Sequence, residues 1–441
     1  MTTIPQVATR MQQVLTDEAD RAGVQTRFVQ RSDAKLTGSI FTQTLVFGLG
    51  ADPQASLGAL TQTTAALGVT VTAEALHQRF DRAAASCLEQ VLCAALRRVV
   101  ASNPIVLPIL DRFAEVVVQD STVISLPEAL VDVWQGCGNG TPHAGNAALK
   151  LHLALDLRTG RLRGPSLHPG REPDVAATVE ADLPDGAVRL VDLGFWDLAL
   201  LDRLHQRGVY WFSRMQAMTA VQTADGQWWQ RLDLLRAPPA APLDLAVRLG
   251  REDQVVARLI AVRVPQEVVN QRRRRLRQEA KEKGHTVSAL RLALAGWSVF
   301  VTTIPPELLS VAEALILSRA RWQIELLFKL WKSHGQIDLV RAVQPWRVLC
   351  ELYGRLLGQI VQHWLLVISC WEDAARSLPK AAQTIRAHWL LLACALPTHV
   401  RLVEAITTLA RCIQAGCRMN RRKKHPNTYQ RFLAAAESCV T

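Results

Sequence analysis

The sequence lacks the cysteine patterns that mark secreted and zinc-binding proteins. Its nine cysteines include no CxxC pair, and no secretory leader is recognisable at the N-terminus. Cys412 and Cys417, followed by His425, have a spacing that fits no common zinc site. We therefore expect reduced core thiols in a cytoplasmic protein.

Long apolar runs without polar interruption are also missing. The most apolar C-terminal window, residues 352–371, contains Arg355, Gln359, Gln362 and His363. A lipid-facing helix would not carry so many polar side chains, so the window predicts a helix buried on one side and no membrane partner. We find neither an internal repeat nor a low-complexity tract.

Acidic residues are in deficit. The chain has 39 Asp and Glu against 51 Lys and Arg, a net charge of +12 and a pI of about 9.6. Such a balance favours a polyanionic partner, usually nucleic acid. The alternative is a basic surface that binds no particular partner. With 441 residues, 49% of them hydrophobic, the chain can bury a large core and form two or three domains.

The first region, residues 1–105, is predicted to be helical. A helix over 55–67 ends at Gly68, and a second begins after Thr72 and runs on without a break, which is the outline of a DNA-binding helix-turn-helix. An ordinary pair of antiparallel helices is the alternative. The second helix begins with residue types that reach DNA: His77, Gln78, Arg79 and Arg82.

The periodicity changes after Asn103-Pro104. Residues 110–215 contain short β-branched or alternating runs and helical runs in the order β-β-β-α-β-α-β, with one helix over 174–181. This order predicts a mixed α/β domain with a hairpin at its start. In the strand at 149–157, Lys150 and His152 share a face, which we interpret as one that contacts DNA.

Residues 216–295 are predicted to be a β-rich insertion with a basic run that includes Arg272 and Arg273. Residues 296–340 return as the last strand and a long helix, and residues 341–441 are predicted to be a helical region with a basic tail. Charge runs are usually solvated faces or mobile arms, but in a DNA enzyme they can hold phosphates. The basic tail contains Arg418, Arg421, Arg422, Lys423 and Lys424.

The long helix is predicted to run unbroken from about Val311 to Gly335. Ser310 and Glu313 have the spacing of a capping box at its start. Beside its apolar face lies a polar stripe, a feature that is also common on solvated helices. The stripe consists of Ser318, Arg321, Glu325, Lys329 and Lys332.

Two aspartates, Asp120 and Asp192, follow predicted strands. Each alone is most often a turn former or a helix cap. Together with Glu325 on a helix against the same sheet, they have the layout of a ribonuclease-H-like site, and three converging carboxylates suit two Mg²⁺ ions. The predicted fold class is therefore α/β, with a ribonuclease-H-like catalytic core interrupted by a β-rich insertion and with helical N-terminal and C-terminal regions.

Three segments carry a more specific resemblance, namely VVVQDSTVISLP, LVDLGFWDLALLDRLHQRGVYWFSRM and SRARWQIELLFKLWK. They resemble blocks of the DDE transposases of bacterial insertion sequences, in the cut-and-paste group with a Tyr–Arg–Glu–Lys signature. The resemblance implies that Asp120, Asp192 and Glu325 are the catalytic metal ligands. Arg321 and Lys332 would hold phosphates of the element end, while Ser318 occupies the tyrosine position.

The same resemblance implies the cofactor and the partners. We expect two Mg²⁺ ions, for which Mn²⁺ can substitute, and double-stranded DNA as both inverted-repeat end and target. A homodimer in the DNA complex, a hairpin intermediate and a nucleoid-associated location in the bacterial cytoplasm are further expectations. Trp297 could stack on a base extruded during cleavage, although a tryptophan buried in the core is the alternative.

Two other functions stay open at this point. One is a ribonuclease-H-like DNA nuclease without strand transfer. The other is a decayed transposase that acts only as a DNA-binding protein, which the presence of all three carboxylates disfavours.

Overall fold

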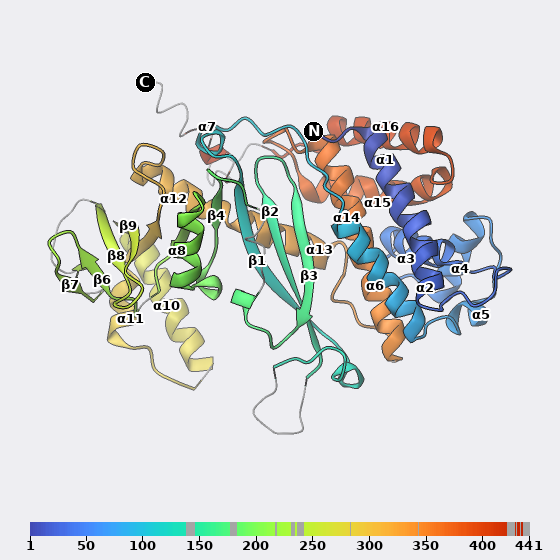
Figure 1. Ribbon diagram of the computed structural model, residues 1–441, viewed down its shortest axis with the longest axis horizontal. Coiled ribbons are helices and arrows are strands. Elements are labelled where there is room, and N and C mark those ends of the chain that lie inside the picture. Colours follow the sequence, from blue (N-terminus) through green and yellow to red (C-terminus); the bar gives the residue numbers. More distant parts are fainter. Residues whose placement is uncertain are drawn as a thin grey trace. The chain divides into compact units, whose positions relative to one another are not determined.

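The computed structural model describes all residues except 138–145, 177–182, 217, 231–233, 236–241, 283, 343, 421–427, 429, 433 and 435–441. The chain forms two compact units, whose elements are labelled in Figure 1. Unit 1 comprises residues 1–106, 120–172 and 322–430, and unit 2 comprises residues 107–119, 173–321 and 431–441. No helix in the described part of the chain is long and apolar enough to cross a membrane.

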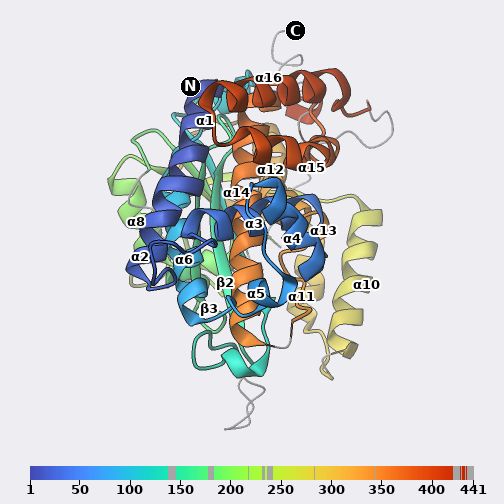
Figure 2. The same cartoon turned by 90° about the vertical axis from the view of Figure 1, so that its right-hand side faces the viewer.

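Unit 1 is organised around the helix α14 (Pro345–Cys370). Every residue of α14 from Val348 to Val367 is buried. Four other helices pack most extensively against it, and α15 packs in turn on α16, as Figure 2 shows. The prediction of a helix buried on one side is therefore wrong, because neighbours cover α14 all round. The packing partners are α3 (Gly38–Ala51), α6 (Arg82–Leu96), α15 (Leu378–Ala395) and α16 (His399–Gly416).

The polar side chains of α14 find partners inside the unit. A ring nitrogen of His363 lies 2.7 Å from the carbonyl oxygen of Gly160, so the neutral ring donates one hydrogen bond. Gln362 donates to Gln359 at 3.1 Å. Burial lowers the pKa of His363 to about 4, against a smaller opposing effect of the Gly160 hydrogen bond. The folded state therefore holds this ring neutral.

We expect the unfolding free energy to fall as the pH drops from about 6.5 to about 4. Over that range the unfolded chain takes up a proton at His363, whereas the folded chain resists it, because the folded pKa is about 4. The loss should reach about 3 kcal/mol at the low end. Urea denaturation of the wild type and of His363→Gln at several pH values measures it, and the variant should have a flatter pH dependence. His399→Gln, which changes an exposed histidine, should keep the wild-type slope.

The N-terminal part of unit 1 departs from the predicted helix-turn-helix. The helix α4 (Leu57–Ala66) forms, and Gly68 follows it with a φ of +87°, as expected. The second helix, α5 (Ala73–His77), has only five residues. The prediction that it runs on is wrong, because Asp81 accepts a hydrogen bond from the Ala84 N–H at 2.8 Å and so caps α6 as a new helix. The remaining N-terminal helices are α1 (Ile4–Gln12), the π-helix η1 (Gln13–Glu18) and α2 (Ala19–Gln25).

Unit 1 also contains a β-hairpin. Strands β2 (Ala148–Asp156) and β3 (Leu162–Pro169) pair antiparallel, which confirms the predicted hairpin. Gly160 lies in its turn with a φ of +72°, and a Cβ at this position would lie 2.5 Å from the ring of Trp371. The hairpin turn therefore packs directly against residues at the end of α14 and requires glycine.

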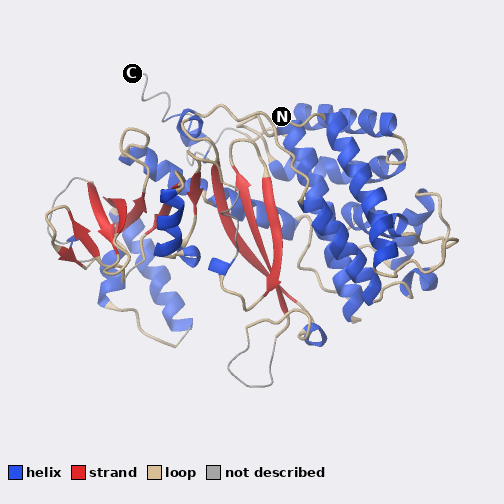
Figure 3. Cartoon of the chain, viewed as in Figure 1, coloured by secondary structure: helices blue, strands red, loops and turns tan. Residues whose placement is uncertain are grey.

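Unit 2 is dominated by a sheet (Figure 3). Its strands follow the order β1-β4-β5-β10-β9-β8-β6-β7. The first three run parallel, and the others are antiparallel to their neighbours. This sheet, with the helices of both units, confirms the mixed α/β class. The strands are β1 (Val116–Ser125, whose last six residues belong to unit 1), β4 (Val188–Leu190), β5 (Tyr210–Arg214), β6 (Val221–Thr223), β7 (Trp228–Trp229), β8 (Leu243–Leu249), β9 (Val255–Arg263) and β10 (Trp297–Thr302).

Several helical segments of unit 2 differ from the expectation. The predicted β-rich insertion contains two helices as well as strands, α10 (Gln266–Glu282) and α11 (Ala289–Leu294). The basic run lies on α10. Of the helix predicted over 174–181, only a 3-10 turn at Asp174–Ala176 is described. Unit 2 also includes α7 (Pro108–Asp111) and α8 (Leu198–Gln206).

The predicted long helix is two helices. They are α12 (Val311–Ala320) in unit 2 and α13 (Trp322–Ser333) in unit 1. The backbone at Arg321 keeps helical angles, with φ −52° and ψ −34°, but the hydrogen-bond ladder is interrupted there. The capping box between Ser310 and Glu313 is present at the start of α12, as predicted.

Candidate active site

Asp120 lies inside a strand. β1 continues to Ser125, because Thr122, Val123 and Ile124 extend the β-branched run, so the expectation of a strand end at Asp120 is wrong. The side chain is half-buried, and one of its carboxylate oxygens accepts the Ser121 N–H at 2.8 Å. Strand β1 thus holds this carboxylate on rigid backbone.

Asp192 lies two residues after β4, where a strand end was expected. Its Oδ1 accepts the N–H of Gly194 at 2.8 Å, and the residue caps a short 3-10 turn, Leu193–Phe195. A Cβ placed on Gly194 would lie 2.8 Å from Oδ2 of Asp174 and 3.1 Å from Oδ1 of Asp192. Two carboxylates therefore flank Gly194. Sequence reasoning missed Asp174, whose only signal was its place in a segment that was taken for a helix.

Glu325 projects from α13. The predicted apolar face of this helix is buried, including Ile324, Leu327 and Trp331, and Glu325 is half-buried beside it. Two apolar side chains on the same helix are exposed, Trp322 at 51% and Leu326 at 52%. Apolar groups held in solvent beside a carboxylate are candidates for contact with a ligand, and the helical pattern did not single them out.

The other members of the polar stripe have different environments. Lys332 donates a long hydrogen bond of 3.4 Å to the carbonyl oxygen of Val123, which ties the end of α13 to β1 within unit 1. The hydroxyl of Ser318 donates to the Leu315 carbonyl at 2.8 Å, so it is turned back to its own helix. Lys329 is exposed, and Arg321 is half-buried at the junction between α12 and α13.

The start of α12 is anchored by an ion pair. Arg112 lies 2.6 Å from Glu313, whose side chain also accepts the N–H of Ser310 at 2.9 Å. Burial alone would raise the pKa of Glu313, but the hydrogen bonds from Arg112 and Ser310 outweigh it, so this pKa is lowered. The carboxylate remains charged and fixes where α12 begins.

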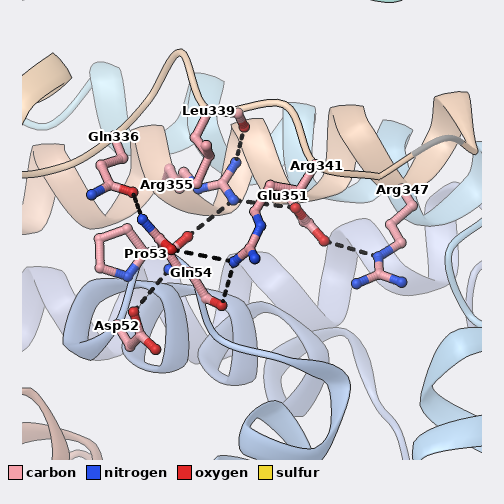
Figure 4. Close-up of polar contacts among 9 residues, drawn as sticks. All are labelled: Asp52, Pro53, Gln54, Gln336, Leu339, Arg341, Arg347, Glu351 and Arg355. Atoms are coloured by element: carbon pink, nitrogen blue, oxygen red, sulfur yellow. Dashed lines mark hydrogen bonds and ion pairs between the residues drawn. The ribbon is translucent and has the colours of Figure 1, made fainter.

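The chain that follows α13 is fixed by a second ion-pair network, drawn in Figure 4. Arg355 of α14 is 4% exposed and lies 3.2 Å from Glu351. Its guanidinium also donates to the carbonyl oxygens of Leu339 at 2.9 Å and Pro53 at 3.1 Å. Burial lowers the pKa of Arg355, although Glu351 opposes the shift. One guanidinium therefore joins α14, the loop after α13 and the loop after α3.

Glu351 and Arg341 extend this network. Glu351 also pairs with Arg347 at 2.9 Å, and Arg341 donates to the Gln54 carbonyl at 3.1 Å (Figure 4). The segment between α13 and α14 thus has bonds on both sides. Because Glu325 is on α13, the network helps to hold the helix that carries it.

A basic cavity of about 650 Å³ lies within unit 2. It is lined by Trp297, Arg214, Arg272 and Arg291, among others. Trp297 is half-buried at this cavity and is not a core residue, and the guanidinium of Arg263 lies 4.9 Å from its ring. An aromatic ring among arginines suits a ligand that is both planar and anionic.

Four side chains predicted to contact DNA make contacts within the chain. Arg272 donates to the Trp297 carbonyl at 2.8 Å and to the Ser298 hydroxyl at 3.0 Å, and Arg273 donates to the Leu292 carbonyl at 3.0 Å. The Arg79 guanidinium lies 4.1 Å from the ring of Phe28 and donates to its carbonyl. Lys150 donates to the carbonyl of Glu172. Their predicted DNA contacts stay predictions.

His152 is 1% exposed and packs edge-on against His168, with ring centroids 4.9 Å apart. The expectation that it faces DNA is therefore wrong, because both sides of β2 are covered at this point. Four residues of the basic tail, Arg421, Arg422, Lys423 and Lys424, lie outside the described residues.

The candidate metal ligands are distributed over both units. Asp120 and Glu325 belong to unit 1, and Asp192 and Asp174 belong to unit 2. Among the residues that the structure describes, no group of three or more His, Cys, Asp or Glu side chains could hold a metal ion. The donors themselves fit a hard divalent cation, because they are half-buried carboxylates held by backbone N–H groups, as for Asp120 and Asp192.

Fold and site together define an α/β protein with acidic residues on a strand, after a strand and on a helix. The sequence profile of the family described as "Transposase DDE domain" matches residues 111–358, more than half of the chain. The chain belongs to this family, and the predicted resemblance to transposases of bacterial insertion sequences is confirmed.

Named relatives agree with this assignment. The chain is 26% identical over 318 residues to the transposase for insertion sequence element IS231E of Bacillus thuringiensis subsp. finitimus. The aligned region covers 67% of this chain and 66% of that protein. The chain is 24% identical over 321 residues to the transposase for IS1151 of Clostridium perfringens, with the same coverage of 67% and 66%. The matches thus span just under two thirds of these relatives' lengths.

Proposed function

We propose that this protein is the transposase of an insertion sequence, which cleaves DNA at the ends of its element and joins them to a target. The observation that carries the proposal is that the family match, residues 111–358, includes Asp120, Asp192 and Glu325. The basic balance of the chain, +12, agrees with a DNA partner.

In this proposal Asp120, Asp192 and Glu325 together hold divalent metal, in a ribonuclease-H-like core. When bound, two Mg²⁺ ions would supply charge stabilisation for an in-line displacement at phosphorus. The chain's own task is to position the phosphate and neutralise its charge. We assign that task to Arg321 and Lys332, which flank Glu325 in sequence, and Mn²⁺ can replace Mg²⁺.

The Trp297 cavity is proposed to receive an extruded base. The half-buried indole offers a stacking surface, and arginines around it can hold the adjoining phosphates. A flipped base would accompany a hairpin intermediate. The hydroxyl of Ser318 contributes less here than a tyrosine would, since it bonds to its own helix.

The wider assembly is also a proposal. Two element ends must be brought together, so we expect a homodimer on DNA, with residues 1–105 contacting the inverted repeat. This function requires the protein to be in the cytoplasm and associated with the nucleoid.

A joining assay tests the proposed function. The protein, Mg²⁺ and a pre-cleaved end duplex are incubated with a supercoiled plasmid, and joined products are counted. A transposase should insert the end into the plasmid, whereas cleavage without any joining would support the nuclease alternative. Binding with neither reaction in Mg²⁺ or Mn²⁺ would support a DNA-binding protein that has lost catalysis.

Gly194→Ala should lower the rate of DNA cleavage by about 10- to 100-fold with little change in stability. The added methyl would lie 2.8 Å from Asp174 and 3.1 Å from Asp192, so both carboxylates must move, and small displacements of reacting groups have effects of this size. Nicking rates and thermal melting midpoints of the purified variant measure the two effects. Gly416→Ala is the control, because nothing lies within 4 Å of its added methyl. Equal nicking by the two variants would contradict the assigned role of Asp192.

A further inference from the structure

The helix α10 has two different basic faces. On its inner face Val269 and Ala280 are buried, and Arg272 and Arg273 donate hydrogen bonds to carbonyl groups around Trp297 and Leu292. Arg272 therefore holds the helix against the strand that carries Trp297, and Arg273 holds it against α11. From the sequence alone, both charges in the basic run would be expected to contact a ligand, but in the structure both form hydrogen bonds within the protein.

Three other cations lie on the outer face. Arg274, Arg277 and Lys281 are all exposed, and none of them forms an ion pair with any described residue. Their spacing of three and four residues places them on one side of the helix, over about 10 Å of its length. We call these three residues the outer stripe. Arg275 differs from them, because it pairs with Glu279 at 2.8 Å.

We propose that the outer stripe binds the phosphate backbone of duplex DNA, as a contact separate from the Trp297 cavity. The proposal rests on the proposed function and names a further surface for the same substrate. The three cations of the outer stripe are aligned along the helix and match the closely spaced phosphates of a DNA duplex. Arg and Lys bind such phosphates independently of the base sequence.

The composition of the outer face favours DNA over an acidic protein. Besides the stripe, the outer face carries the exposed polar residues Asn270, Gln271 and Gln278 and the exposed carboxylate of Glu267. Protein interfaces usually need a desolvated aromatic or aliphatic anchor at their centre, and this face offers none. A contact with the DNA backbone requires only cationic side chains that are long enough to approach the phosphates.

The position of the stripe also has a consequence for the cavity. Arg272, Leu276 and Glu279 of the same helix line the cavity from the inner face. A duplex held by the outer stripe is therefore about one helix diameter, roughly 10 Å, from the Trp297 cavity. One rigid helix then sets the distance between a gripped duplex and the site proposed for an extruded base.

The test is a salt titration of binding. Fluorescence anisotropy with a labelled 30-bp duplex, in EDTA so that no cleavage occurs, gives the dissociation constant between 50 and 200 mM salt. Replacing all three residues with Gln should reduce the slope of log Kd against log salt by about 2.7, since each phosphate contact contributes about 0.9. Over this salt range the wild type should then lose about 40-fold more affinity than the variant.

Arg401→Gln is the control, and its slope should stay at the wild-type value because this exposed cation of α16 belongs to none of the proposed DNA contacts. Equal melting midpoints for all three proteins establish that the fold is kept. An unchanged slope in the triple variant would overturn the proposal. Magnesium-dependent nicking by the wild type is measured separately. Its absence would remove the proposed function without changing the result for the stripe.

Discussion

Replacing Asp192 with Asn should lower the rate of DNA cleavage by about 1,000-fold or more while leaving DNA binding intact. The substitution preserves the shape of the side chain and an oxygen that can accept the Gly194 N–H, which the aspartate binds at 2.8 Å. It removes the negative charge that a divalent cation requires. Loss of several kcal/mol of charge stabilisation corresponds to such a factor, at about 1.36 kcal/mol for each tenfold change.

The same result is expected for Asp120→Asn and Glu325→Gln. Nicking of an end-containing duplex in Mg²⁺ and Mn²⁺ gives the rates, and anisotropy gives the binding. Asp197→Asn is the control. Asp197 caps α8 through a 3.0 Å bond from the Leu200 N–H, a role that Asn also fills. Full cleavage by any one of the three site variants would remove the proposed three-carboxylate mechanism.

Glu351→Ala should lower the free energy of unfolding by about 3–5 kcal/mol. Arg355 is 4% exposed and lies 3.2 Å from this carboxylate, so the substitution leaves a buried guanidinium without its counter-ion. Urea denaturation followed by circular dichroism measures the change. A double variant, Glu351→Leu with Arg355→Met, should be less destabilised than the single one, because no buried charge remains.

The exposed pair on α10 provides the control for this prediction. Arg275 and Glu279 have the same i, i+4 spacing, but their side chains are 81% and 43% exposed. Glu279→Ala should therefore change stability by less than about 1 kcal/mol. If Glu351→Ala has an equally small effect, the network of Figure 4 does not stabilise the segment that follows α13.

Local patterns in the sequence predicted much of what is local in the structure. The capping box of Ser310, the hairpin between β2 and β3 and the glycine after α4 are all present. Each depends on residues close together in the chain, whose spacing fixes their geometry. Asp192 follows its strand for the same reason.

Features that depend on distant contacts could not be predicted in this way. The complete burial of α14 reflects helices that lie far away in the sequence. The arginine run divides into Arg272 and Arg273, which are bonded internally, and neighbours that are exposed, and only the packing of α10 decides which is which. The proximity of Asp174 to Asp192 likewise arises from the fold, through the turn at Gly194.

The central position of α14 has a consequence for how the protein is made. Its packing partners α3 and α6 are complete by Leu96, whereas α14 begins at Pro345, about 250 residues later. At about 5–20 residues per second, a ribosome needs roughly 12–50 s to synthesise that interval. During this time the apolar faces of α3 and α6 have no α14 to cover them. A nascent chain arrested before Pro345 should therefore be held by chaperones or degraded, and the N-terminal helices should gain protease resistance only after α14 emerges.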